Sequence, residues 1–385
     1  MKERFRKFRL AGAATGLCFL LSTASGNAQV TPAEGYTPPD DTPKVNVGGT
    51  IFADYTYQDM PTGKDADGGV IHPNSFNLAR AYINVTGQIS HWVSFRITPD
   101  ITRQTISSGA TGVTLNTNNN LVYRLKYAYG QINFDDFATH GSWLRIGTQQ
   151  TPYVDFEEGV YRYRFQGTIF VDREGFLSSS DFGITTHWNI PMNYGDVHVG
   201  VYNGETYTGA EANDQKAFQA RVTIRPAPGI AIVKGVRLTG FYDGDHYQKD
   251  AERRRAVALL TFENPFVHAG FSYLDAKDRS SRLKTFSTHA AGWSIWVTPR
   301  TPIGIEALLR YDELKPNRDN NLLDPDGKKK RFIGGLAYWF PVTKAGISAA
   351  LLADYENVKY EGFASASSNN KPEEKRYALH TLFNF

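Results

Sequence analysis

The segment 150–181, QTPYVDFEEGVYRYRFQGTIFVDREGFLSSSD, places carboxylates and guanidinium groups close together. Its candidate functional residues are Asp155, Glu157, Glu158, Arg162, Arg164 and Arg173. If this segment lined a narrow space, its two kinds of charge would create a transverse field, which selects ions and orients polar solutes. The alternative is a solvated loop whose charges serve solubility. The length of the segment and its many aromatic residues favour insertion into an interior, because such rings need packing partners.

The elements that must position this segment are strands, because apolar residues recur at every second position from Val45 onwards. The predicted strands are 44–57, 74–87, 91–103, 121–134, 142–149, 182–190, 195–203, 216–226, 234–243, 253–263, 266–275, 286–298, 302–312, 330–341, 346–356 and 374–385. Polar faces of two of them carry four further candidates, which we expect to line an interior wall: Arg221, Arg225, Glu306 and Arg310.

The connections between these sixteen strands alternate between seven short turns and eight long segments. Such a meander predicts an all-β protein, a 16-stranded antiparallel transmembrane β-barrel of the outer-membrane porin type, over residues 44–385. The turns would then face the periplasm and the long connections the exterior, with 150–181 as a constriction loop. A β-sandwich would not need so many strands in simple order, and a propeller would show a repeat that is missing here. A secreted soluble β-protein is a further alternative.

The N-terminal residues 1–28 have the build of a secretory signal peptide, with basic residues followed by an apolar run that ends on small residues. A Pro-rich segment, 29–43, follows it. Removing the five basic and one acidic residues of 1–28 from the chain's 42 and 39 leaves 37 and 38, so the remaining chain is nearly neutral. This balance gives no reason to expect a nucleic-acid partner. The chain also contains 21 Tyr, 24 Phe and 6 Trp despite a mean hydropathy of −0.41, a combination that suits a membrane barrel.

The sequence ends in KRYALHTLFNF, in which an aromatic and aliphatic stripe alternates with more polar residues. The stripe consists of Tyr377, Leu379, Phe383 and Phe385, interrupted by Thr381. We expect it to face lipid on the last strand, which would pair with the first and remove the edges of the sheet. A terminal Phe after alternating hydrophobic residues also resembles the signal that outer-membrane assembly machinery recognises.

Two stretches of the chain resemble a known family. WLRIGTQQTPY, followed by VDREGF and SDFGI, is similar to the central signature of phosphate-selective porins of the O/P type, and FNLARAYINVTGQISHWVSFRITPD is similar to their early strand pair. The resemblance implies a homotrimeric porin, either general or anion-preferring. One departure concerns the substrate: where such porins often have a basic residue before the loop's Pro, this chain has Gln149, Gln150 and Thr151 before Pro152. Phosphate selectivity is therefore not implied residue by residue.

We expect an outer-membrane porin through which small hydrophilic solutes and ions diffuse, weakly selective or with a preference for anions such as phosphate. Its partners would be the lipid bilayer, lipopolysaccharide and the assembly machinery. The alternative is a non-conducting barrel that binds or adheres through its long exterior loops. No Ser, His and carboxylate spacing marks a nucleophile, so we do not expect an enzyme. KDADGGV and DPDGKKK lack the glutamate that closes a calcium loop, so we expect turns there and no cofactor.

Overall fold

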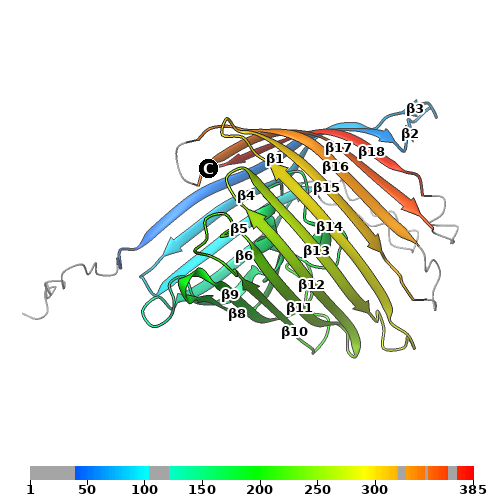
Figure 1. Ribbon diagram of the computed structural model, residues 1–385. Coiled ribbons are helices and arrows are strands. Elements are labelled where there is room, and N and C mark those ends of the chain that lie inside the picture. The colour runs from blue at the N-terminus through cyan, green and yellow to red at the C-terminus, as the bar shows by residue number, and fades with distance from the viewer. Residues whose placement is uncertain (1–39, 104–120, 320–326, 343–345, 363–370) are drawn as a thin grey trace, which may run out of the picture. The chain divides into compact units, whose positions relative to one another are not determined.

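A computed structural model describes residues 40–103, 121–319, 327–342, 346–362 and 371–385 of the 385-residue chain. From Thr42 to Phe385 the described residues form one compact unit. Sixteen antiparallel strands close into a single barrel, in which each strand pairs with its neighbours in the sequence and β18 returns to β1 (Figure 1). The predicted 16-stranded all-β barrel is confirmed. Residues 1–28 and most of 29–43 lie outside the described residues.

The strands of the barrel have the following bounds: β1 (Lys44–Met60), β4 (Asn74–Gln88), β5 (Val93–Arg103), β6 (Leu121–Asn133), β7 (Trp143–Gln150), β8 (Ser180–Ile190), β9 (Gly195–Tyr202), β10 (Ala217–Ile224), β11 (Arg237–Gln248), β12 (Ala251–Glu263), β13 (Val267–Asp278), β14 (Thr288–Pro299), β15 (Ile305–Lys315), β16 (Lys328–Trp339), β17 (Ser348–Glu361) and β18 (Glu374–Asn384). Two short strands, β2 (Gly63–Lys64) and β3 (Val70–Ile71), form a separate hairpin in the first long connection.

The last strand closes the barrel against the first. Their register pairs Ile51 with Phe383 and Tyr55 with Leu379. Beyond this ladder, the Phe385 backbone N–H donates to the Gly49 carbonyl at 2.9 Å, and the Gly49 N–H donates to the Phe385 carbonyl at 2.8 Å. The Phe385 ring lies over Gly49, where a Cβ atom would come within 2.6 Å of it. The terminal residue is therefore built into the closure of the sheet.

Period-two alternation separates an apolar outer face from a mixed inner face. On β10, Phe218, Val222 and Ile224 are exposed, whereas Arg221 and Thr223 between them are buried. On β18, the outer face carries Tyr377, Leu379 and Phe383, and the inner face carries Ala378, His380 and Leu382. These two strands thus present the two environments that a membrane barrel needs.

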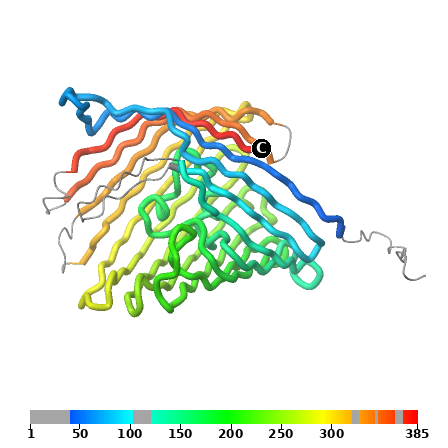
Figure 2. The backbone as a smooth tube through the Cα atoms, turned by 180° about the vertical axis from the view of Figure 1, so that it is seen from behind, coloured from blue at the N-terminus to red at the C-terminus, as the bar shows by residue number. Residues whose placement is uncertain are grey.

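The chain between β7 and β8, residues 151–179, is called the inner loop here, because it lies inside the ring of strands (Figure 2). It contains two helices, α2 (Val154–Tyr161) and α3 (Phe170–Arg173), while a 3-10 turn, η1 (Pro191–Asn193), lies between β8 and β9. In the described part of the chain, no helix has both the length and the apolar character to cross a membrane.

The hydrophobic core lies within the barrel rather than between two layers. It joins buried side chains of the inner loop to inward apolar residues of β1 and of strands from β11 to β18. The inner loop thereby covers one side of the interior wall.

Candidate functional site

Aromatic side chains fix the inner loop to one side of the barrel. Tyr153, Tyr161 and Tyr163 are completely buried and belong to the same core as Leu308 and Ile333 of the wall. Tyr161 packs edge-on against Trp296 with ring centroids 5.3 Å apart, and Tyr163 packs against Trp339 at 5.9 Å. Burying one such side chain contributes roughly 1.5–3 kcal/mol, so several together hold the loop firmly.

Polar contacts fix the same loop to β15. The Tyr163 hydroxyl donates to Glu306 Oε2 at 3.0 Å, and Arg162 Nη1 donates to Glu306 Oε1 at 3.3 Å. Arg310 Nη1 donates to the carbonyl of Thr168 at 2.8 Å and holds Asp312 through two hydrogen bonds of 2.9 and 2.8 Å. These contacts fix the loop to β15 at two places, near Arg162 and at Thr168.

A second group of contacts fixes the loop to β14 and β17. Arg173 Nη1 donates to Glu356 Oε2 at 3.2 Å. Glu157 is buried, where it accepts from the Tyr153 hydroxyl at 2.7 Å and from Trp296 Nε1 at 3.3 Å. Its carboxylate thus faces the packed side of the loop and not an aqueous space.

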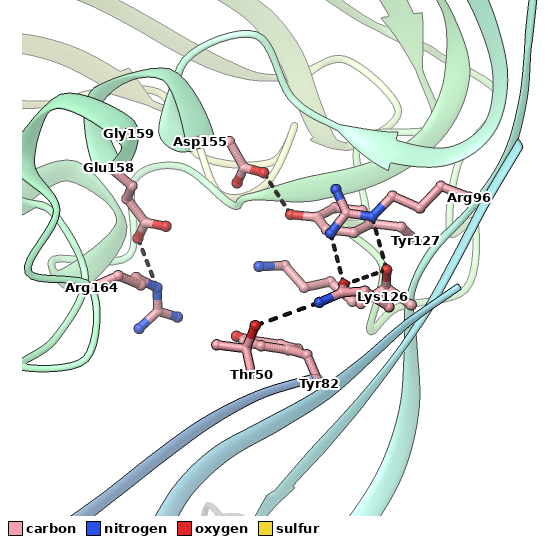
Figure 3. Close-up of a pocket in the computed structure, with 11 residues that line it drawn as sticks. Thr50, Tyr82, Arg96, Lys126, Tyr127, Asp155, Glu158, Gly159 and Arg164 are labelled. Carbon is pink, nitrogen blue, oxygen red and sulfur yellow. Dashed lines mark hydrogen bonds and ion pairs between the residues drawn. The ribbon is translucent and has the colours of Figure 1, made fainter. Parts of the chain in front are cut away.

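The opposite face of the loop borders a cavity of about 280 Å³ (Figure 3). The loop contributes Asp155, Glu158 and Arg164 to this cavity. The barrel wall contributes polar and aromatic side chains of β1, β4, β5 and β6, namely Thr50, Tyr82, Asn84, Arg96, Thr98, Lys126 and Tyr127. We call this space the constriction cavity.

Cations predominate on the wall of the constriction cavity. Lys126 Nζ lies 5.1 Å from the ring centroid of Tyr82 and 5.0 Å from that of Tyr127, and Arg96 lies over Tyr127 at 4.6 Å. Arg96 also donates to Asn84 and Thr98. Within the described residues, neither cation is paired with a carboxylate. In Figure 3 the Lys126 side chain extends toward the space between wall and loop.

The charges on the loop side are closer to balance. Arg164 Nε and Glu158 Oε1 form an ion pair at 2.8 Å, and the Tyr127 hydroxyl donates to Asp155 at 2.7 Å. Burial raises the pKa of Glu158 to about 7, although Arg164 and Lys126 favour its charged form. Together with the wall, the cavity therefore carries a net positive charge, which increases when Glu158 takes up a proton.

The structure divides the six charged residues expected at a constriction into two groups. Asp155, Glu158 and Arg164 line the constriction cavity, whereas Glu157, Arg162 and Arg173 do not. Arg162 and Arg173 are directed to the wall on which the loop packs, where they pair with Glu306 and Glu356. Glu157 bonds to Tyr153 of the loop and to Trp296 of the same wall. Arg173 is 12% exposed and Arg162 26% exposed, so the loss of its carboxylate partner would cost more at Arg173.

The four expected wall residues also differ in their placement. Glu306 and Arg310 anchor the loop from the inner face of β15, and inward-facing Arg221 pairs with Asp196 and lies 4.0 Å from the Phe156 ring centroid. Arg225 was expected within a strand, but β10 ends at Ile224. The residue that follows Arg225 is Pro226, which has no N–H to continue the ladder.

Arg96 and Lys126 are basic wall residues that were not predicted from the sequence. A signal was available, because Arg124 and Lys126 alternate in LVYRLKYAYG as inward positions do. What the sequence could not show is that Arg96 on the preceding strand and the inner loop would lie beside them. In the described residues, no group of three or more His, Cys, Asp or Glu side chains is placed to hold a metal ion.

No protein-family model matches this sequence, and no curated protein matches it either. Solved structures do resemble it. The anion-selective porin from Comamonas acidovorans aligns with a TM-score of 0.59 and 9% identity, over 89% of this chain and 100% of that chain. The outer membrane channel DcaP of Acinetobacter baumannii aligns with a TM-score of 0.54 and 11% identity, over 91% and 99%. The trimer form of in-vitro folded OmpT, an outer membrane protein of Vibrio cholerae, aligns with a TM-score of 0.53 and 10% identity, over 90% and 100%. At these identities the likeness shows a shared fold, the porin-type barrel.

Proposed function

We propose that this protein is an outer-membrane porin, a water-filled channel through which small hydrophilic solutes and ions diffuse passively, with a preference for anions. The short turns face the periplasm and the long connections face the exterior. The outer face contacts lipid and lipopolysaccharide. The stripe from Tyr377 to Phe385 serves as the signal for the assembly machinery.

The observation that carries this proposal is the asymmetry of the interior. A barrel of about 16–18 strands encloses an aqueous channel, and here the inner loop packs on one side of it. The other side is a polar wall on which Arg96 and Lys126 have no carboxylate partner among the described residues. A passage between a fixed loop and unpaired cations favours anions, because charged rings in a narrow pore select ions of the opposite sign.

The similar structures support the proposal. One of them is named an anion-selective porin, and another is named an outer membrane channel. A third is named a trimer form, which supports a homotrimer here. The finer resemblance to O/P-type porins stays a prediction. Gln149, which stands near the position of a common basic residue in that family, is buried and accepts from the Thr185 hydroxyl at 2.6 Å.

The first test is conductance of the detergent-folded protein in planar bilayers. We expect ohmic steps, in groups of three if the homotrimer inserts as a unit. Folded protein that inserts but never conducts would favour the alternative of a binding or adhesion barrel, and a mature chain that stays folded without detergent would favour a secreted protein.

A second test distinguishes the two sides of the inner loop. Neutralising Arg164, which lines the constriction cavity, by Arg164→Gln should lower the chloride preference in a salt gradient. The matched control Arg162→Gln removes a cation that is paired with Glu306 on the packed side, and we expect a smaller change. A larger effect from Arg162→Gln would mean that the passage runs along the side of the loop that faces β15, and this would contradict the proposal.

A further inference from the structure

We infer that the passage is adapted to small hydroxylated monocarboxylates, the chemical class of short-chain sugar acids. This inference deepens the proposed channel function and depends on it. It stands on a second cavity, on the charges around that cavity, and on its position relative to the constriction cavity.

The second cavity, called the vestibule here, has a volume of about 550 Å³. Its wall is dominated by hydroxyl and amide side chains, including Thr56, Gln58, Ser75, Asn77, Thr102 and Gln166. Hydroxyls and amides both donate and accept hydrogen bonds, as the hydroxyl groups of a polyol do. The vestibule lining contains no Phe, Tyr or Trp, so it offers no stacking surface for flat apolar solutes.

Several hydrogen bonds hold these groups in place. Asp54 Oδ1 accepts from the Thr56 hydroxyl and from Asn77 Nδ2, each at 3.0 Å, and Asn77 Oδ1 accepts from the Ser75 hydroxyl at 3.2 Å. On the opposite side, Gln166 of the inner loop donates to Asp354 at 2.8 Å. A fixed set of donors and acceptors loses little conformational freedom when it binds a solute.

The arginines of the vestibule differ from the cations of the constriction cavity, because each already has a carboxylate partner. Arg80 pairs with Asp100 at 2.5 Å, and Arg376 pairs with Glu356. Both carboxylates are shared with further arginines, so the pairing lowers the positive charge without cancelling it. Asp54 adds a carboxylate that has no ion-pair partner among the described residues. In the described part of its lining, the vestibule therefore offers mainly hydrogen-bonding groups and no cation without a carboxylate partner.

The two cavities follow one another along β1, β4 and the inner loop. On β4, Asn77 and Arg80 line the vestibule, and Tyr82 and Asn84 line the constriction cavity. On the loop, Gln166 borders the vestibule and Arg164 borders the constriction cavity. A solute that enters through the vestibule meets hydrogen-bonding groups and paired arginines first, and cations without a carboxylate partner next.

A hydroxylated monocarboxylate matches both steps. Its hydroxyl groups exchange water for the vestibule side chains, and its single carboxylate is attracted by Lys126 and Arg96. A pore that is built to hydrogen-bond hydroxyl groups disfavours an analogue without them, since its own polar groups are then left unpaired. Inorganic phosphate would gain from the cations, but in the vestibule it would first meet the carboxylate of Asp54 and arginines that already have carboxylate partners.

The experiment compares two four-carbon carboxylates, threonate with three hydroxyls and butyrate with none, by bi-ionic zero-current potentials in planar bilayers. Threonate is the larger and more hydrated anion and diffuses more slowly in water, so a threonate-to-butyrate permeability ratio above one must originate in the channel. We expect such a ratio, and we expect threonate to permeate better than phosphate.

Shape-preserving substitutions locate the effect. Thr56→Val and Asn77→Leu each remove hydrogen-bonding groups from the vestibule, and each should lower the threonate-to-butyrate ratio by about 3-fold, the effect of roughly one neutral hydrogen bond. The control Thr381→Val makes the same change as Thr56→Val, on a side chain of the outer face that bonds to the carbonyl of Ala53, and it should leave the ratio unchanged.

Three results would overturn the inference: a ratio at or below one, phosphate permeating better than threonate, or equal ratios in Thr56→Val, Asn77→Leu and the control. Each of these can occur in a channel that conducts chloride, and the proposed function would then stand. Absence of chloride conductance would instead overturn the proposed function itself.

Discussion

Charged side chains inside the barrel differ in whether they have partners. Arg310 and Asp312 form a two-bond pair, and Arg331 bridges Glu174 and Glu356, so these charges stabilise the packed side of the loop. Arg96 and Lys126 lie instead on tyrosine rings. Lys126 is buried, and a buried ammonium group without a carboxylate is costly, so this cation favours an anion in the constriction cavity that it borders.

We expect Glu158 to make the selectivity of the proposed channel dependent on pH. Its pKa, raised to about 7 chiefly by burial, lies above the ordinary value of a carboxyl group. As the pH falls from 8 to 6, Glu158 becomes neutral and Arg164 is no longer balanced. We therefore expect the chloride-to-potassium permeability ratio to increase over this interval, measured by zero-current potentials at several pH values.

The control for this effect is Glu158→Gln, which is neutral at every pH. Histidines titrate in the same interval, so the informative quantity is the difference between the wild type and Glu158→Gln. A wild-type profile as flat as that of the variant, or a ratio that decreases on acidification, would contradict the assigned role of Glu158.

At the scale of single residues, the sequence identified the charges of the inner loop but not their directions. Asp155, Glu158 and Arg164, which were expected near a pore, line the constriction cavity, and their role in a pore stays a prediction. Arg162 looked equivalent to Arg164 because the two are separated by one residue. Its partner Glu306 is distant in the sequence, and nothing local to 150–181 indicates this pairing.

At the scale of elements, strands were predictable because the alternation of apolar and polar residues lies within the sequence of each strand. The contrast between a lipid face and an interior face is contained in every strand, so no tertiary information is needed to recognise it. The helices α2 and α3 were not expected, since their stability depends on packing against the wall and short helices have little of their own.

The wall on which the inner loop packs can be recognised in the sequence by apolar residues at inward positions. In IEALLRYD, Leu308 follows the inward Glu306 and precedes the inward Arg310, so an apolar residue interrupts the polar face. A strand that is apolar on both faces needs cover inside the barrel as well as outside. Leu274, Ile333 and Leu352 follow the same rule and belong to the same core.

Leu308 and Leu309 provide a matched test of whether the loop packs against this part of the wall. Leu308 is fully buried against the loop, whereas Leu309 is 45% exposed on the outer face. Leu308→Ala leaves a cavity and should cost about 2–5 kcal/mol of stability, seen as a lower temperature for loss of the folded band on gels. Leu309→Ala should have a smaller effect, and equal losses would mean that the loop is not held there.

The last strand supports a prediction about assembly. Deleting Phe385 removes both backbone hydrogen bonds to Gly49 and the ring that covers it. We expect a lower yield of folded barrel in the outer membrane, with near-normal conductance in the molecules that fold. Phe340→Ala, a change to an exposed aromatic residue elsewhere, is the control; equal yields of the two variants would argue against a terminal signal.

At the scale of the whole molecule, the closed barrel separates three environments. Its outer face is apolar, one side of its interior holds the inner loop, and the other side is polar and basic. We propose that the passage follows this polar side and that three such barrels assemble. This division could not be predicted from the sequence, because it depends on which wall the inner loop covers.

The most direct test of this account is the zero-current potential in a potassium chloride gradient, measured on wild-type channels and on Lys126→Gln. The account predicts a potential with the sign of chloride permeation in the wild type. It predicts a shift toward zero in Lys126→Gln, because a wall cation without a carboxylate partner has been removed. Cation-selective wild-type channels, or a potential that Lys126→Gln leaves unchanged, would contradict it.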